Sequence, residues 1–439
     1  MSCFRTHARM HTLHVLGCAI IGATLVPSAS AAPELPSQPL AARVIVKSVT
    51  FAGTGRTDVT IDCSSGWCNN YPTPHWLDAN ADGDALDPED NLAPVAYTRG
   101  SRPAVTDLVF TVQPADLTVP NVEVVGVGPH GETYWGIGNV TNGELIVPGT
   151  LEADQPLPNV VDCYDPYSIE WTVSKAGYGS RDAGISSNTM YVTYAQPIGS
   201  RLESYFDIST RAAAGSSDEQ QTIDLIWDDF ADLEVYNAHG ERLAYYRGVL
   251  CSYDCRYYSA AQLVYYTTSQ CGGWADLMIQ CLRTQGIGTA QFITIEPQAG
   301  PDPPRDCRNA YAGGIVVKNY GISSAYILGS QCKTYPFRFN DPCALNTPWA
   351  SVDVQDEPGL PGQDNANPAS WFRRHFIVKV NFAYYDPAYG GGPFEGTREE
   401  ANLLWEQGAM WGYWGYADSA LHVGVRRDHY DIRETGFDR

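Results

Sequence analysis

The sequence predicts a multidomain fold, in which an N-terminal β-sandwich is followed by an α+β domain. Three observations lead to it. Short runs of β-branched and aromatic residues, separated by Gly, Pro, Asn and Asp, fill residues 43–200, which is typical of strands joined by turns. Apolar residues recur at helical spacing within residues 201–439. The chain has 439 residues, of which 44% are hydrophobic and 18% charged, so it can form two or three globular domains.

The N-terminus is typical of a secretory signal peptide, residues 1–31. Arg5 and Arg9 give it a positive start, and an apolar stretch at residues 15–26 leads to small residues before a cleavage site at Ala31. This stretch is too short for a comfortable membrane span. We therefore expect a secreted, periplasmic or cell-surface protein with no transmembrane segment.

The mature chain is strongly acidic. Of the 28 basic residues, Arg5 and Arg9 leave with the signal, so 26 basic residues face 50 acidic ones and the net charge is −24. Such a chain is repelled by nucleic acids and by anionic membranes. Neither is expected as a partner.

The strands are expected to begin after residues 32–42, a Pro- and Ala-rich segment that is predicted to be a linker. No long helical period interrupts the β region, and Trp171 is expected to point inward. The predicted form is a β-sandwich of immunoglobulin-like type, as one domain or two. Its clearest strands are expected at residues 43–47, 108–112, 170–174 and 190–194.

The second domain begins near Arg201 with a change to helical periodicity. The spacing of Ile223, Ile226, Trp227 and Phe230 predicts a first helix there. The following elements are expected to be strands within residues 233–246, a helix at residues 260–267, and a helix from Cys271 that stops at Gly286.

The helix that begins at Cys271 is predicted to bury one face. At 100° per residue, the apolar face holds Cys271, Trp274, Ala275, Met278, Cys281 and Leu282, and the polar face holds Asp276, Gln280, Arg283 and Thr284. Because Cys281 lies on the apolar face, it is expected to be a buried, inert thiol.

Cys271 differs from Cys281 because it opens the helix. Unpaired N–H groups and the positive end of the helix dipole lie there, and both stabilise a thiolate. The N–H of Cys271 can also point at a developing oxyanion, and Gly272 and Gly273 leave room for a substrate. The alternative is a buried or disulfide-bonded cysteine, which is the commoner fate of an exported Cys.

The base that a thiol nucleophile needs is expected from a hairpin near the C-terminus. Residues 372–380 are predicted to form a strand with His375 near its start, and residues 381–387 a turn and a second strand. This hairpin places Asp386 beside His375. Cys271, His375 and Asp386 then form a catalytic triad, in which the carboxylate fixes the tautomer of the base.

The remaining cysteines belong to a compartment that permits disulfides. Twelve are present, and Cys3 and Cys18 leave with the signal. If Cys271 is free, nine remain, and an odd number requires a further free thiol, for which Cys281 is the candidate, or an intermolecular bond. Close neighbours that could each close a small loop are Cys63 with Cys68, and Cys251 with Cys255.

These segments resemble the transglutaminase-like superfamily of cysteine enzymes. The stretch from Ser269 to Cys271, followed by Trp274 and Ala275, is similar to that family's Gly-Gln-Cys-aromatic-Ala segment, and residues 385–387 are similar to its Asp-Pro segment. Residues 359–363, 367–368 and 385–390 also resemble exported bacterial members. The resemblance covers roughly residues 201–439. It implies an α+β, papain-like fold.

The resemblance also implies a function. A member of this superfamily is expected to be a cysteine peptidase or a transglutaminase that acts on a protein or peptide and needs no organic cofactor. Trp227 and Gln262 are the candidates for a second oxyanion donor. The chain departs from the family pattern at Ser269, where Gly is usual, and in carrying Gly272 where animal transglutaminases have Trp. Hydrolysis and amine transfer therefore both stay open.

Two non-enzymatic functions are the alternatives. One is an extracellular binding or structural protein with a catalytically silent transglutaminase-like fold, for which a disulfide at Cys271 would be the sign. The other is a calcium-stabilised carbohydrate or cell-wall binder. The 11 Trp and 27 Tyr are spread along the chain, so core packing explains them better than a sugar-binding surface does.

An acidic loop in the β region predicts a structural calcium site. It fits the spacing D-x-[DN]-x-[DN]-G-x5-E, which places oxygen ligands around a sharp turn at Gly83. Pro88 argues against an exiting helix, so a loop inside the β domain is expected rather than an EF-hand. The alternative is a solvated Asp/Gly turn. The expected ligands are Asp78, Asn80, Asp82, Asp84 and Glu89.

Overall fold

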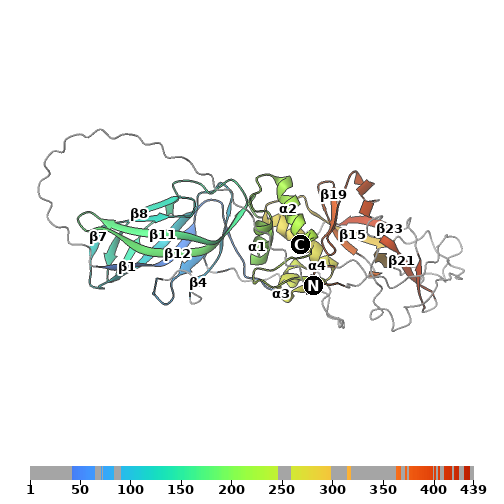
Figure 1. The fold of residues 1–439 in the computed structure, drawn as a ribbon, viewed down its shortest axis with the longest axis horizontal. Coiled ribbons are helices and arrows are strands. Elements are labelled where there is room, and N and C mark those ends of the chain that lie inside the picture. The colour runs from blue at the N-terminus through green and yellow to red at the C-terminus, as the bar shows by residue number, and fades with distance from the viewer. Residues whose placement is uncertain are drawn as a thin grey trace, which may run out of the picture.

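The structure is a computed structural model. Figure 1 shows β1 to β12 at one end of the molecule, the helices α1 to α4 beside them, and the strands β15 to β23 beyond the helices. Residues 1–41, with the predicted signal peptide, lie outside the described residues. The described residues are 42–64, 71, 73–83, 90–245, 259–297, 314–317, 362–366, 371–372, 375–398, 400–401, 404–405, 410–417, 420–424 and 430–435.

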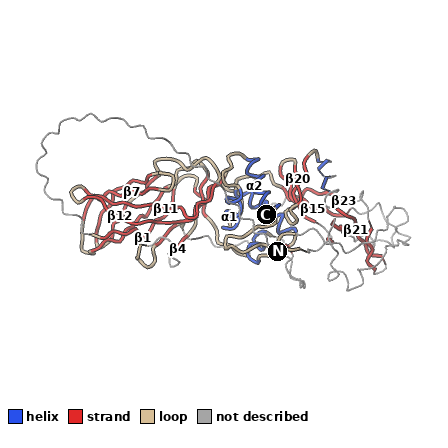
Figure 2. The backbone as a smooth tube through the Cα atoms, viewed as in Figure 1, coloured by secondary structure: helices blue, strands red, loops and turns tan. Residues whose placement is uncertain are grey.

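The N-terminal region is one large, curled sheet of 12 strands, as the tube in Figure 2 shows. Its order is β2-β5-β12-β11-β7-β8-β9-β6-β1-β3-β4, and β10 pairs with β6. The strands are β1 (Arg43–Ala52), β2 (Arg56–Asp58), β3 (His75–Leu77), β4 (Asn91–Leu92), β5 (Val95–Thr98), β6 (Ala104–Gln113), β7 (Val119–Val127), β8 (Thr133–Thr141), β9 (Glu144–Val147), β10 (Leu151–Glu152), β11 (Asp162–Lys175) and β12 (Gly179–Thr193).

The curled sheet encloses a single hydrophobic core. Nearly all of its strands contribute buried residues to it, among them Trp76, Tyr134 and Trp171. The Asn188 side chain on β12 donates hydrogen bonds to the carbonyls of His75 (3.2 Å) and Ala93 (3.1 Å), which joins β12 to the β3 side of the sheet. The predictions of a β-rich region and of an inward Trp171 are confirmed.

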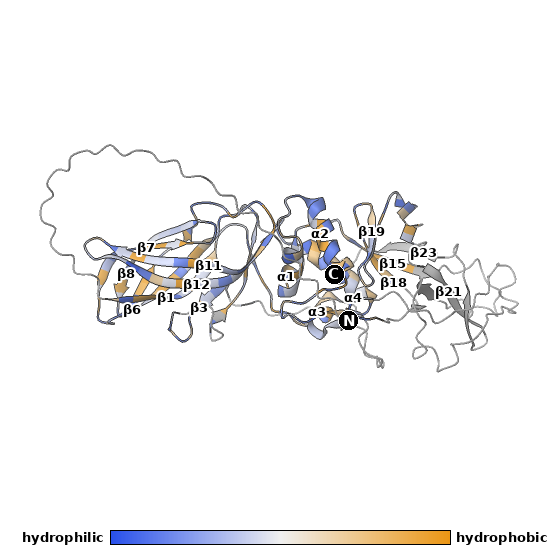
Figure 3. Cartoon of the chain, viewed as in Figure 1, coloured by the Kyte–Doolittle hydropathy of each residue, from blue (hydrophilic) through white to orange (hydrophobic). Residues whose placement is uncertain are grey.

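Four helices lie within residues 203–284, and side-chain caps mark the start of two of them. The Asp218 carboxylate accepts the N–H of Gln221 at 2.9 Å, and the Ser259 hydroxyl accepts the N–H of Gln262 at 3.3 Å. Figure 3 shows polar residues on the outer turns of α2 and apolar ones on its inner side. The helices are α1 (Glu203–Ala212), α2 (Glu219–Ala231), α3 (Ala260–Tyr266) and α4 (Cys271–Thr284).

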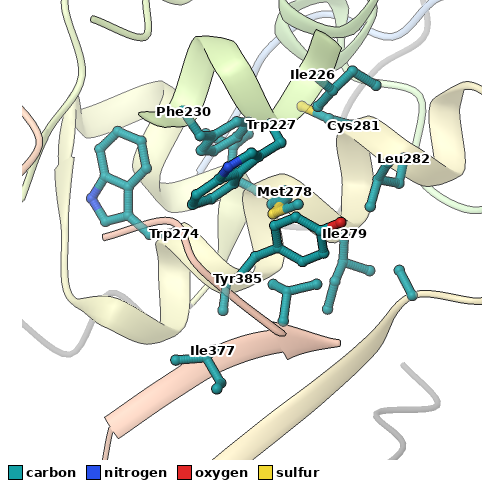
Figure 4. Close-up of a cluster of buried hydrophobic side chains, with 14 of the residues drawn as sticks. Ile226, Trp227, Phe230, Trp274, Met278, Ile279, Cys281, Leu282, Ile377 and Tyr385 are labelled. Atoms are coloured by element: carbon teal, nitrogen blue, oxygen red, sulfur yellow. The ribbon is translucent and has the colours of Figure 1, made fainter. Parts of the chain in front are cut away.

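Helix α4 is the centre of the second region. It ends at Thr284, and Gly286, the predicted stop, follows two residues later with a φ of 78°, a left-handed conformation that Gly adopts without strain. The six residues expected on its apolar face are all buried, but Thr284, expected on the polar face, is buried as well. That expectation was wrong because α4 is packed by other helices and by the strands below it, as Figure 4 shows around Met278 and Ile377.

The segment between α2 and α3 contains less strand than predicted. Within residues 233–245, the regular pairing is limited to β13 and an isolated bridge between Tyr236 and Arg242. Turns around Gly240 occupy the rest. Strand β13 (Ala244–Tyr245) pairs in parallel with β14 (Thr268–Ser269), which leads directly into α4.

A five-stranded sheet of order β20-β19-β18-β15-β23 packs against α4. A four-stranded sheet has the order β17-β16-β21-β22. The strands are β15 (Gln291–Pro297), β16 (Gly314–Val317), β17 (Trp371–Phe372), β18 (His375–Val380), β19 (Ala383–Asp386), β20 (Gly391–Glu395), β21 (Met410–Ala417), β22 (Ala420–Gly424) and β23 (Tyr430–Thr435).

The β region and the helices are joined by buried contacts. The carboxylate of Asp62 accepts the N–H of Ser204 at 3.1 Å and also its hydroxyl, so a residue of the β region caps α1. The rings of Tyr191 and Phe206 stack at 5.6 Å. Among the helices of the described segments, none is long and apolar enough to cross a membrane.

Candidate active site

Cys271 is the first residue of α4, as predicted. Gln270 precedes it in an extended conformation and forms the N-cap. Because the first turn of a helix has no acceptors four residues earlier, the N–H groups of Cys271 and Gly272 point out of the helix end, where they favour negative charge. Cys271 is a free thiol with 4% of its surface exposed. The disulfide-bonded alternative for Cys271 is therefore not what this structure has.

The first turn of α4 packs closely against the residue that leads into it. A Cβ atom added to Gly273 would lie 2.1 Å from the Ser269 hydroxyl oxygen and 2.7 Å from its Cβ. Gly273 thus allows β14 and α4 to meet at a sharp corner, and this corner sets the direction in which Cys271 leaves the helix.

Gly273→Ala is expected to lower the free energy of unfolding by about 1–3 kcal/mol, because overpacking against Ser269 outweighs the better helix propensity of Ala. Ser269→Gly in the same chain should restore stability, since the next neighbour of the added methyl group is the Ser259 carbonyl at an ordinary 3.4 Å. Urea unfolding of the two single variants and the double variant measures this. A Gly273→Ala protein as stable as wild type would contradict the packing argument.

His375 and Asp386 form a buried pair, as the hairpin prediction required. The imidazole Nε2 lies 2.7 Å from the Asp386 Oδ2. The antiparallel register pairs Val378 with Tyr385, and continuing it puts Asp386 opposite Ile377. His375 lies two residues earlier on the same face, so the pair is a diagonal cross-strand contact. His375 is 0% and Asp386 2% exposed.

The third member of the predicted triad also contacts the imidazole. Burial acts to lower the pKa of His375, but the charge of Asp386, the charge of Cys271 and the hydrogen bonds of the imidazole with both side chains raise it to about 10. The imidazolium form is therefore favoured at neutral pH. The structure thus brings the three predicted residues together, since the imidazole interacts with both the Asp386 carboxylate and the Cys271 sulfur.

Two aromatic rings that were not predicted as site residues pack beside the imidazole. Trp405 lies nearly parallel to His375, with ring centroids 6.3 Å apart and an angle of 22°, and Tyr389 lies at 5.7 Å and 41°. Tyr389 follows the Asp386-Pro387 segment by two residues, which was an available signal. Trp405 lies in no recognisable motif. His375 is fully buried beneath these rings, and the exclusion of water strengthens its electrostatic coupling to Asp386.

The other thiols in the described part of the chain are poor nucleophiles. Cys281 is free and fully buried, as predicted, and burial raises its pKa well above the ordinary value, with Asp229 and Asp276 adding to the effect. Burial also raises the pKa of Cys163, a second free thiol, to about 12. Cys63 is disulfide-bonded. Its predicted partner Cys68 lies outside the described residues, as do Cys251 and Cys255.

The two oxyanion candidates lie on helices α2 and α3. Trp227 is on α2, and its ring lies 5.0 Å from that of Tyr385, the neighbour of Asp386; Figure 4 shows the two rings together. Gln262 lies in the first turn of α3, and its N–H is bonded to the cap residue Ser259. Their role as oxyanion donors stays a prediction.

The acidic loop is only partly within the described residues. Asp78 is buried and accepts the N–H of Gly83 at 3.0 Å, and the Asn80 amide donates to Asp82 at 3.0 Å. Asp84 and Glu89 lie outside the described part. The described residues hold no cluster of three or more His, Cys, Asp or Glu that could bind a metal ion. The calcium site stays a prediction.

Comparison with known proteins adds no further identification. A scan against known protein families finds no matching family model, and a search of curated proteins finds no significant match.

Proposed function

We propose that the chain is an exported thiol acyl-transfer enzyme that acts on peptide or glutamine amides through Cys271, His375 and Asp386. The observation that carries this proposal is the buried His375, which bonds to Asp386 at 2.7 Å and contacts the Cys271 thiol at a helix N-terminus. A nucleophile, a base and a group that orients the base are what covalent amide chemistry needs. The fold that fits this set is an α+β, transglutaminase-like domain.

The first half-reaction forms a thioester. The Cys271 thiolate attacks the amide carbonyl carbon, and the carbonyl π electrons move to the oxygen. The N–H of Cys271 at the start of α4 stabilises this oxyanion. The His375 imidazolium gives its proton to the leaving nitrogen, the C–N bond breaks, and an amine or ammonia departs.

The second half-reaction releases the acyl group. The neutral His375 now takes a proton from water or from an amine, whose oxygen or nitrogen attacks the thioester carbonyl. Collapse of the tetrahedral adduct breaks the C–S bond and returns the Cys271 thiolate and the His375 imidazolium. Water gives hydrolysis, as in a peptidase or deamidase, and an amine gives transfer, as in a transglutaminase.

The test combines an activity assay with a substitution. The mature chain is incubated with a protein substrate such as casein and a fluorescent primary amine; incorporated label indicates transfer, and fragments indicate proteolysis. Cys271→Ala is expected to abolish both products and the labelling by a thiol-reactive amide probe. Cys281→Ala serves as the matched control, because that thiol is buried on the same helix. Unchanged probe labelling of Cys271→Ala would reject the assignment.

If Cys271 of the wild-type chain resists alkylation, the result favours the alternative, a non-catalytic extracellular protein with the same fold. The proposal of an enzyme is favoured over it because His375 has both partners that a catalytic imidazole needs.

We also propose that the N-terminal region is an immunoglobulin-like domain stabilised by calcium at the acidic loop. The buried Asp78 and the turn at Gly83 support it, since calcium loops need fixed carboxylates around a tight turn. Saturating calcium is expected to raise the melting temperature, because ligand binding to the native state alone stabilises it. Asp82→Ala should remove the response. A melting temperature that calcium leaves unchanged would count against the site.

A further inference from the structure

Gln363 is a fully buried amide outside the proposed triad, and its hydrogen bonds reach the segment that carries Asp386. Its side-chain Nε2 donates to the carbonyl of Pro387 at 2.8 Å and to that of Phe230 at 2.7 Å. Pro387 directly follows Asp386. Phe230 lies near the end of α2. Because both acceptors are carbonyl oxygens, the amide can take only the orientation in which its NH2 group faces them.

The backbone of Gln363 continues the same connection. Its N–H donates to the carbonyl of Ala388 at 3.2 Å, and its carbonyl accepts the N–H of Tyr245 at 2.7 Å. The neighbouring Asn365 amide donates to the Tyr245 carbonyl at 2.7 Å. The turn at residues 362–366 is therefore bonded on one side to the two residues that follow Asp386 and on the other to β13.

Strand β13, to which the turn at residues 362–366 is bonded, pairs with the strand that precedes Cys271. In the parallel pair of β13 and β14, Tyr245 is opposite Ser269, and Cys271 follows two residues later. A second contact runs through Phe230, whose ring meets that of Trp274 on α4 at 6.2 Å and 88°, as Figure 4 shows. Gln363 thus takes part in two of the connections between α4 and the Pro387 segment.

We propose that Gln363 is a positioning residue that holds the Asp386 segment and the start of α4 at the separation which lets His375 contact both Asp386 and Cys271. This inference rests on the proposed function, because it assigns Gln363 a part in keeping that triad assembled. Its side chain acts through Pro387 and Phe230 and touches no reacting atom. A displacement of about 1 Å in such a constellation can cost on the order of a hundredfold in rate.

Iodoacetamide alkylation of Cys271 as a function of pH tests the proposal without a known substrate. The full mature chain is used, and mass spectrometry follows the peptide that bears Cys271. In Gln363→Met the side chain keeps its size and loses both donors, while the backbone bonds of residue 363 remain. We expect its alkylation rate at pH 6 to fall at least tenfold below wild type, because His375 no longer contacts the Cys271 sulfur in the displaced site. Gln363→Asn, with an amide one methylene shorter, should fall less.

Gln285→Met is the matched control. Gln285 is equally buried and also uses its amide, accepting the Tyr194 N–H at 2.9 Å and donating to Ser209 at 2.8 Å. It lies at the other end of α4, roughly 20 Å from Cys271 at 1.5 Å per residue. Its replacement should lower the melting temperature about as much and leave the pH profile of Cys271 unchanged.

The outcomes separate the two proposals. If wild-type Cys271 is alkylated only like an ordinary thiol, the proposed function fails. If wild-type Cys271 is reactive at pH 6 and both Gln363 variants keep the wild-type profile, the positioning role is overturned while the function stands. Should Gln363→Met fail to fold, Gln363→Asn decides between these outcomes.

Discussion

Asp386→Asn is expected to slow acylation of Cys271 by on the order of 10³- to 10⁴-fold while the fold persists. The Asp386 carboxylate lies 2.7 Å from His375 Nε2 and can only accept a hydrogen bond, so it fixes which ring nitrogen carries the proton. An amide in its place can donate instead and so stabilise the other tautomer. Single-turnover labelling by an amide-based probe measures the loss.

The same variant should change the pH dependence. Burial lowers the pKa of His375, and Asp386 with Cys271 raises it to about 10. Wild-type acylation should therefore hold through neutral pH and fall as the pH approaches 10, when the imidazolium loses its proton. In Asp386→Asn the carboxylate charge no longer opposes the effect of burial on the pKa of His375. The pH at which acylation falls should therefore be lower than in wild type.

Stability should follow the same titration. A histidine whose pKa is raised in the folded state stabilises the fold fully below its ordinary value of 6.5, and that contribution is lost as the pH rises through about 10. Wild type should thus lose stability between these limits, and Asp386→Asn should lose less. Asp276→Asn is the control, because Asp276 on α4 accepts from neutral donors, Ala260 at 2.7 Å and Gln280 at 3.0 Å. Equal profiles for wild type and Asp386→Asn would contradict the dyad.

A chain that begins at residue 201 is expected not to fold cooperatively. Its first helix would lose the Asp62 cap, worth about 1 kcal/mol, and the stacking partner of Phe206. Gln285 at the end of α4 would lose the Tyr194 N–H that it accepts at 2.9 Å. Removal of the β region would also expose large apolar side chains of the helices, and each exposed side chain costs about 1.5–3 kcal/mol. A few of them would cancel a total stability of about 5–15 kcal/mol.

Circular dichroism during thermal unfolding, with the chain from residue 32 as reference, tests this second prediction. The shortened chain should give no sigmoidal transition. Asp62→Ala in the long chain should keep a transition at a lower temperature. A shortened chain that melts at the temperature of the long one would show that the two regions are independent.

The parts of the site that local patterns encode were predictable. The helix that begins at Cys271 has a clear apolar period and a Gly two residues beyond its last residue, Thr284, and the hairpin of His375 and Asp386 has two short strands around a short turn. Both depend on residues near one another in sequence. Their mutual contact required the resemblance to known enzymes as well, since more than a hundred residues separate Cys271 from His375.

Helix α1 could not be predicted because its buried face is partly polar. Ser209 and Thr210 are fully buried, and their hydroxyls bond to backbone carbonyls of the preceding turn, at 2.6 Å to Tyr205 and 2.7 Å to Phe206. A hydrophobic period therefore does not mark it. Gln363 and Trp405 were not predicted as residues of the site for another reason. The residues that they contact are distant in sequence, and only the folded chain brings them together.

The β18–β19 hairpin has the His375–Asp386 pair at one end and its turn at the other. Asn381 and Phe382 connect the strands, Asn381 has a φ of 53°, and Phe382 is 78% exposed. The turn is therefore a suitable anchoring point for a fluorophore or a short affinity peptide. A probe fixed there would move with the strands that carry His375 and Asp386, so it could report local unfolding of that strand pair.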